Sequence, residues 1–180
     1  MSTWWFPDNT VLCNFAAVDR LRLLEKILDG RGRWTEAVAH EAAQSASYHP
    51  ELRTLPIDGW LGLPIEIQDQ TEQQAVERIR RAVFGGEQAR PTQHLGEAQT
   101  CVLITLRGEF HDSTWITDDR SAAEFSRRRG ITTLETMDLM CIAAVTGLVS
   151  STEGHELLQS MAAAGRHLHR TSARPGDLLR

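Results

Sequence analysis

Short apolar runs separated by longer amphipathic stretches predict an alternation of strands and helices along the chain. Runs at 3–6, 33–34, 114–116 and 131–134 have the length and residue types of strands. Stretches in which apolar residues recur every three or four positions predict helices. These stretches cover residues 10–18, 21–28, 35–43, 71–84, 95–107, 120–129, 135–146 and 152–164. Strands alternating with helices are typical of a mainly parallel sheet covered by helices.

One segment interrupts this alternation. Proline and glycine punctuate residues 48–70, where 55–57 and 64–67 are short extended candidates. Residues 51–77 contain six acidic residues and one arginine, a local charge of −5. We therefore predict a domain at 1–150 with an insertion at about 48–90. The simpler interpretation of residues 48–70 is a solvated surface loop. Residues 151–180 form a C-terminal helix and a basic tail, and we expect the tail to fray.

Composition narrows the class of protein. The 180 residues are 41% hydrophobic, which suffices for the core of one domain. A net charge of −5 argues against a generally basic nucleic-acid binder but leaves room for a local basic groove. All basic residues except Lys26 are arginine, whose planar guanidinium suits phosphate, although a preference for arginine codons explains the bias equally well.

Cysteine use and hydropathy bear on the compartment. Cys13, Cys101 and Cys141 are odd in number and far apart, as expected of reduced thiols in a cytoplasmic protein. The N-terminus has no pattern of a signal peptide. No apolar run approaches the roughly 18 residues of a membrane helix, so we expect no membrane partner.

Acidic residues adjoin apolar elements at four places. Asp8 follows the first predicted strand, Glu41 lies in an otherwise apolar helix, and Glu97 opens the most apolar helix. Asp118 and Asp119 directly follow another strand. Converging carboxylates repel one another, and a hard divalent cation such as Mg²⁺ relieves that repulsion. Taken singly, each acid is explained as well by a helix cap, a salt bridge or a solvated face.

The same positions carry a resemblance to a known family. Residues 8–15 (DNTVLCNF), 36–41 (EAVAHE), 95–98 (LGEA) and 116–120 (ITDDR) follow one another as the acidic motifs of PIN-domain proteins do. Residues 134–148 are similar to the C-terminal helix of one PIN subgroup. The resemblance spans about residues 4–149, apart from roughly 48–90. The motifs are short, but their ordered set is fairly specific.

The resemblance implies a small three-layer α/β/α sandwich with a ribonuclease site that depends on Mg²⁺ or Mn²⁺. Carried over by motif position, the metal-binding or ligand-orienting acids are Asp8, Glu41, Glu97 and Asp119, with Asp118 as a close competitor for the last place. Among these, Asp8, Glu97 and Asp119 are the expected metal ligands. Thr10, Thr117 and Arg120 would orient the acids or position the substrate.

The implied partners are RNA, an antitoxin protein if the chain is a toxin of a toxin–antitoxin pair, and a second copy of the chain. Other enzyme classes fit poorly: His40-Glu41 begins a zinc-hydrolase motif, but Gln44 stands where the second histidine is required. There is no Gly-x-Ser-x-Gly elbow, dinucleotide fingerprint or phosphate-binding P-loop. Two hypotheses remain, a metal-dependent ribonuclease and a catalytically inactive PIN-like module that binds protein or RNA.

Overall fold

Three short parallel strands form the centre of the structure, a computed structural model that describes residues 3–179. Strands β1 (Trp5–Pro7), β2 (Thr114–Ile116) and β3 (Thr132–Leu134) pair in that order. In the register, Trp5 lies opposite Thr114, which lies opposite Thr132. All three strands therefore end at the same edge of the sheet, where ligand sites of parallel α/β folds occur.

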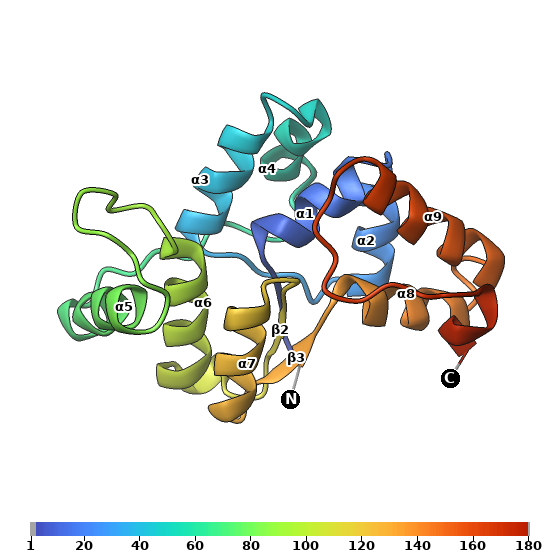
Figure 1. Cartoon of the computed structure of the whole chain (residues 1–180). Coiled ribbons are helices and arrows are strands. Elements are labelled where there is room, and N and C mark those ends of the chain that lie inside the picture. Colours follow the sequence, from blue (N-terminus) through green and yellow to red (C-terminus); the bar gives the residue numbers. More distant parts are fainter. Residues whose placement is uncertain (1–2, 180) are drawn as a thin grey trace.

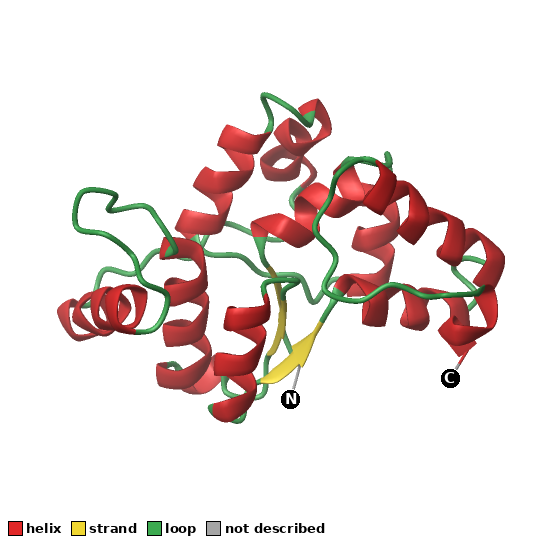
Figure 2. Cartoon of the chain, viewed as in Figure 1, coloured by secondary structure: helices red, strands yellow, loops and turns green. Residues whose placement is uncertain are grey.

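Helices cover both faces of this narrow sheet (Figure 1 and Figure 2). One core packs Trp5 and Ile116 against helices on one face, and a second core packs Phe6 and Trp115 on the other, because side chains alternate along each strand. The first face carries α1 (Asn9–Ala16), α2 (Leu21–Leu28), α3 (Glu36–Ser45), α8 (Thr136–Val145) and α9 (Ser151–Ala163). The second carries α5 (Gln70–Ala82), α6 (Leu95–Leu106) and α7 (Arg120–Arg128). The expected three-layer α/β/α architecture is confirmed.

Pro7 is the last residue of β1, and the hydrogen-bond pattern explains why it is tolerated there. Thr114 donates to the Trp4 carbonyl and Asp8 donates to the Ile116 carbonyl, so the even-numbered groups of β1 face β2. The odd-numbered groups face the other way, where Trp5 donates to the Arg31 carbonyl. The missing N–H of Pro7 thus points away from the main ladder.

The predicted strand at 33–34 is reduced to isolated bridges, Trp5 with Gly32 and Thr35 with Ile65. After its single bridge to β1 at Gly32, the chain runs only a few residues before α3 begins at Glu36. The Arg33 N–H still donates to the Trp5 carbonyl, and the Ile65 N–H donates to the Trp34 carbonyl. The segment is extended, but it pairs with each neighbour at only one position.

Residues 48–70 are not the surface loop that their polarity predicts. The chain forms two short helices, a 3₁₀ turn η1 (Pro50–Thr54) and α4 (Leu55–Asp58), so the extended prediction for 55–57 is wrong. Leu52, Leu55 and Leu61 are buried in the same core as α1 and α3. Apolar residues at irregular spacing are enough to anchor this acidic segment.

The C-terminal region also packs against the rest of the molecule. Helix α9 contacts α8, and a final turn η3 (Pro175–Leu179) buries Leu178 against both. Between them, residues 166–170 cross the carboxyl ends of the strands, so the expectation that the basic tail frays is wrong. Two further short elements complete the chain, η2 (Gly108–Phe110) and the loop of residues 83–94 between α5 and α6. No helix among residues 3–179 has the length and apolar character needed to cross a bilayer.

Candidate active site

Asp8 begins the site because it both ends β1 and caps α1. Its carboxylate accepts a hydrogen bond of 2.9 Å from the Val11 N–H, as an N-cap residue does. The Thr117 hydroxyl, at the end of β2, bonds to the same carboxylate. Only 7% of Asp8 is exposed. A sequence feature that looks like an ordinary cap therefore fixes a buried acid at the ligand edge of the sheet.

Burial raises the pKa of Asp8 well above its usual value, because desolvation disfavours the charged form. The hydrogen bonds from Thr117 and Val11 act in the opposite direction, and the nearby charges of Asp118 and Glu97 raise the pKa further. Asp8 is thus within electrostatic reach of two other predicted acids. The motifs grouped Asp8, Glu97 and Asp118 as candidate site residues, and the fold brings these three acids close enough to interact.

Glu41 joins this group from α3 through its contact with the start of α6. The Gly96 N–H donates to the Glu41 carboxylate, and a Cβ on Gly96 would lie 3.0 Å from Glu41 Oε1. A side chain at position 96 would crowd the carboxylate, which gives the Gly-Glu motif a physical reason. Burial and then the charge of Glu97 raise the pKa of Glu41 to about 7.

Glu97 stands in the first turn of α6, where the helix dipole favours a negative charge. Its Oε1 lies 3.3 Å from Nδ1 of His94, the residue that precedes the helix in a left-handed conformation. We define the acid cluster as Asp8, Glu41, Glu97 and Asp118. Within it, the charges of Asp118 and Glu97 raise the pKa of Asp8, and the charge of Glu97 raises that of Glu41.

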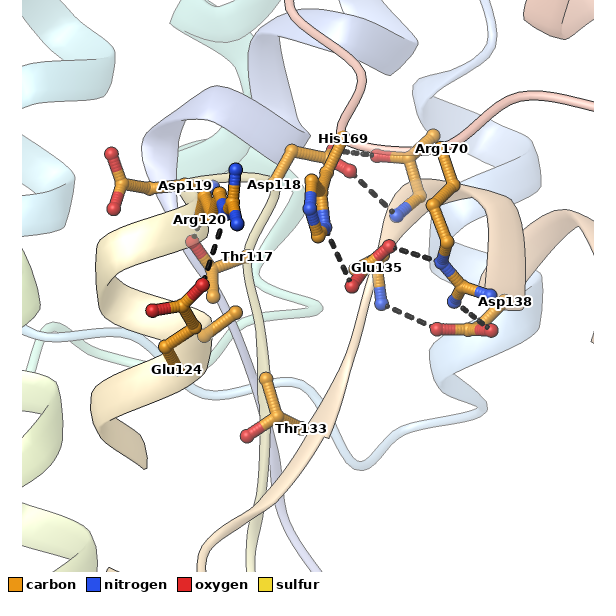
Figure 3. A network of polar contacts seen from close by, with 12 residues as sticks. Thr117, Asp118, Asp119, Arg120, Glu124, Thr133, Glu135, Asp138, His169 and Arg170 are labelled. Atoms are coloured by element: carbon orange, nitrogen blue, oxygen red, sulfur yellow. Dashed lines mark hydrogen bonds and ion pairs between the residues drawn. The ribbon is translucent and has the colours of Figure 1, made fainter. Parts of the chain in front are cut away.

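The two neighbouring aspartates after β2 differ in their surroundings (Figure 3). Asp118 is fully buried, and both of its oxygens are occupied: Thr136 donates its N–H and its hydroxyl, and Asn14 Nδ2 donates across 2.9 Å. Asp119 is partly exposed and uses one oxygen to cap α7, accepting from the Ala122 N–H at 2.7 Å. Asp119 therefore has the freer carboxylate of the two.

Thr117 links Asp8 at the end of β1 to Asp119 at the start of α7. Its hydroxyl bonds to Asp8 and accepts from the Asp119 N–H at 3.1 Å. Thr10 lies in the first turn of α1, two residues after the Asp8 cap. Arg120 is exposed on the outer side of α7, where Nε donates to Glu124 across 2.9 Å.

The donor set suits a divalent cation in its chemistry. Three carboxylates with raised pKa values, those of Asp8, Glu41 and Asp118, lie near the end of the sheet together with Glu97. Mg²⁺ binds oxygen ligands, retains several waters and needs one or two carboxylates from the protein. Within residues 3–179, however, no group of three His, Cys, Asp or Glu side chains is already arranged as a closed metal site. The side chains would have to adjust their rotamers around a partly hydrated ion.

A second polar network lies beside the acid cluster and was missed by sequence reasoning (Figure 3). Glu135, 1% exposed, accepts from Arg127 at 2.8 Å, from His169 Nδ1 at 2.9 Å and from Arg170 at 2.5 Å. Burial raises the pKa of Glu135, but hydrogen bonds from Arg170, Arg127 and His169 outweigh it and lower the pKa to about 2. Arg170 also donates to Asp138.

Asn14 is the other residue missed. It is fully buried in α1, donates to Asp118 and to the His167 carbonyl, and accepts from Arg166. A polar side chain within the apolar run of 11–16 was the available signal. Through Asn14, Glu135 and their partners, residues 166–170 are fastened across the strand ends as a C-terminal strap.

Comparison with known proteins agrees with this geometry. A model of the PIN-domain family matches residues 5–174. The chain belongs to the PIN-domain family. No curated protein and no solved structure gives a significant match. The matched range of this PIN domain includes the 48–90 segment, α9 and the strap, in keeping with their packing on the core.

Proposed function

We propose that this PIN domain is a ribonuclease that depends on Mg²⁺ or Mn²⁺ and hydrolyses RNA phosphodiester bonds. The observation that carries the proposal is the acid cluster: four acids from distant motifs gather at one edge of the sheet, and burial with mutual repulsion raises the pKa of Asp8 and Glu41. Uncompensated buried charge costs stability and persists where it serves a function.

In this proposal Asp8 and Glu97 of the acid cluster would bind the cation together with Asp119, which lies outside the cluster and two residues beyond Thr117, and Thr117 would hold the Asp8 carboxylate in place. A bound divalent cation supplies a polarised phosphate oxygen and an activated water. Both oxygens of Asp118 already accept hydrogen bonds, and in this proposal Asp118 holds Asn14 and the start of α8 at Thr136 in place. Glu41, with a pKa of about 7, would accept the proton that the attacking water loses.

The substrate and setting come from the family rather than from the geometry. The preference for RNA as substrate is tested by comparing cleavage of a labelled RNA with cleavage of a labelled DNA of the same sequence. A toxin role, with an antitoxin as protein partner in the cytoplasm, predicts that induction of the gene arrests growth and that Asp8→Asn relieves the arrest.

The deciding experiment is a titration of Mg²⁺ and Mn²⁺ with a labelled single-stranded RNA. Wild-type protein is compared with Asp8→Asn and Glu97→Gln, and with Asp112→Asn as control. Asp112 is exposed and precedes β2, so it lies at the opposite end of that strand from the site. We expect metal-dependent cleavage by the wild type and the control only. Cleavage without metal, or equal cleavage by all four proteins, would refute the enzyme.

The alternative is a PIN-like module that binds protein or RNA without cleaving it. One observation favours it: the described residues hold no preformed three-ligand metal site. This alternative predicts RNA or protein binding that Asp8→Asn leaves unchanged, and no cleavage at any metal concentration.

A further inference from the structure

A cavity of about 440 Å³ opens beside the acid cluster, between α3 and α6. Figure 1 shows α3 above the start of α6, with the loop between α5 and α6 on the same side. Glu41 belongs both to the acid cluster and to the cavity wall. The volume falls within the range of small-molecule sites. We name this space the α3–α6 cavity.

Its lining combines polar side chains with apolar surface, and no arginine or lysine is among the described residues that line it. One wall is the stripe of Glu36, His40 and Gln44, spaced four residues apart on one face of α3. Ala37 and Leu95 supply apolar surface. A lining with two carboxylates and no strong cation repels phosphate, so it suits the uncharged part of a nucleotide rather than its backbone.

Glu36 gives the cavity a preference among bases. Its Oε1 accepts from Gln99 Nε2 at 3.1 Å, and Gln99 in turn accepts from the Ala37 N–H at 3.1 Å. Both ends of the Gln99 amide are therefore used within the cavity wall, and its Nε2 holds the Glu36 carboxylate in place. A carboxylate accepts hydrogen bonds only, so it favours bases with amino groups and disfavours uracil, whose exocyclic groups are carbonyl acceptors.

The facing wall is held by a buried arginine. Arg80, 2% exposed, donates to the carbonyls of Glu87, Arg90 and Gln93 in the loop that carries Thr92. Its Nε and Nη2 bond to Glu77. The loop is thus pinned at three points, and Thr92 faces the cavity as part of a built wall.

We infer that the α3–α6 cavity binds the base of the nucleotide next to the scissile phosphate, and that Glu36 selects a base bearing an amino group. The inference rests on the proposed function, because it takes the acid cluster as the place of cleavage. Single-stranded RNA is the form that can turn a base outward into such a cavity.

The test measures binding and cleavage separately on the full chain. Four short fluorescent single-stranded RNAs, one each of A, C, G and U, are titrated with protein in Ca²⁺, and affinity is read by anisotropy. Cleavage in Mg²⁺ or Mn²⁺ is mapped on an RNA of mixed sequence. The variants are Glu36→Gln and Gln44→Ala, with Glu156→Gln, exposed on α9, as the control. Gln44 is itself exposed, so its removal leaves the core intact.

We expect the wild type to bind at least one amino-bearing RNA about tenfold more tightly than oligo-U, as a good base contact allows. Glu36→Gln should reduce that preference and shift the cleavage sites, Gln44→Ala should weaken binding, and the control should match the wild type. Equal binding of all four RNAs, no binding, or a preference that survives in both variants would overturn the inference.

The outcomes separate the two proposals. Metal-dependent cleavage with a preference that neither variant changes overturns the base site and leaves the ribonuclease standing. Base-selective binding that Glu36→Gln removes, without cleavage in any metal, keeps the cavity as a base-binding site but overturns the ribonuclease and, with it, the position of that base beside a scissile phosphate.

Discussion

Two buried carboxylate regions lie close together in this PIN domain and have opposite electrostatics. In the acid cluster, Glu41 meets another carboxylate, and its pKa rises to about 7. In the neighbouring network, Glu135 is more deeply buried, yet hydrogen bonds from Arg170, Arg127 and His169 outweigh burial and lower its pKa to about 2. Burial raises the pKa of both acids, and only the arginine and histidine donors around Glu135 reverse that effect.

We expect the two regions to respond differently when one of their carboxylates is neutralised. Removal of a compensated carboxylate leaves its cations without a partner and therefore destabilises the fold. A carboxylate that is uncompensated destabilises the metal-free fold, so its neutralisation should raise stability, while the proposed function predicts that it lowers cleavage. Stability and activity should therefore change in opposite directions in the acid cluster.

The largest expected effect is that of Asp8→Asn on cleavage. Loss of the charge should lower RNA cleavage by about 100- to 1,000-fold, the scale seen when one electrostatic group of an active site is removed. The melting temperature of the metal-free protein should rise, because the amide keeps the cap but not the repulsion. Rate measurements and thermal melts on one preparation test both. A lower melting temperature would contradict the comparison.

Glu135→Gln should cost about 2 kcal/mol of unfolding free energy at pH 7, since Arg127 and Arg170 lose a buried charged acceptor. Because the folded pKa of about 2 is below the ordinary value of 4.5, this stability is full above about pH 4.5 and is lost as pH falls towards 2. Urea titrations at several pH values measure it. Equal stability of the two proteins at pH 7 would show that the network is not holding the strap.

Glu41→Gln should stabilise the metal-free protein by about 1–2 kcal/mol at pH 8. The folded pKa of about 7 exceeds the ordinary 4.5, so the wild type has no penalty below pH 4.5, acquires it as the pH rises from 4.5 to 7, and has the full penalty above about pH 7. The difference between the two proteins should therefore vanish near pH 4.5. Melts across this range, with Glu156→Gln as control, are the measurement, and a pH-independent difference would contradict the assigned cause.

The smallest effect is expected for Arg120→Ala. Its ion pair with Glu124 is exposed, so the unfolding free energy should change by no more than about 0.5 kcal/mol. If Arg120 positions phosphate, RNA affinity should fall several-fold and the salt dependence of binding should weaken by about one counterion. Arg127→Ala is the matched contrast, because Arg127 holds Glu135 and its loss should mainly reduce stability.

Much of the fold was predictable because its signals are local. The strand at 114–116 was predicted at its observed bounds, and the main helices lie within two residues or so of their predicted ends. Periodicity, caps such as Asp8, and glycines after helices act over a few residues. The errors fell where packing replaced local preference: the helical turn at 55–58, and the basic tail that ion pairs fasten to the core.

The sequence by itself determined the order of the elements and the four acidic motif positions, because each depends on neighbours within one helical turn or one strand. Only the tertiary structure decided that Asp118 is saturated by Asn14 and Thr136 while Asp119 keeps a freer carboxylate. Only it brought His169 and Arg170 to Glu135 from more than 30 residues away. The physical reason is that the charge state of a buried acid depends on which donors folding carries to it, and those donors have no fixed spacing in the chain.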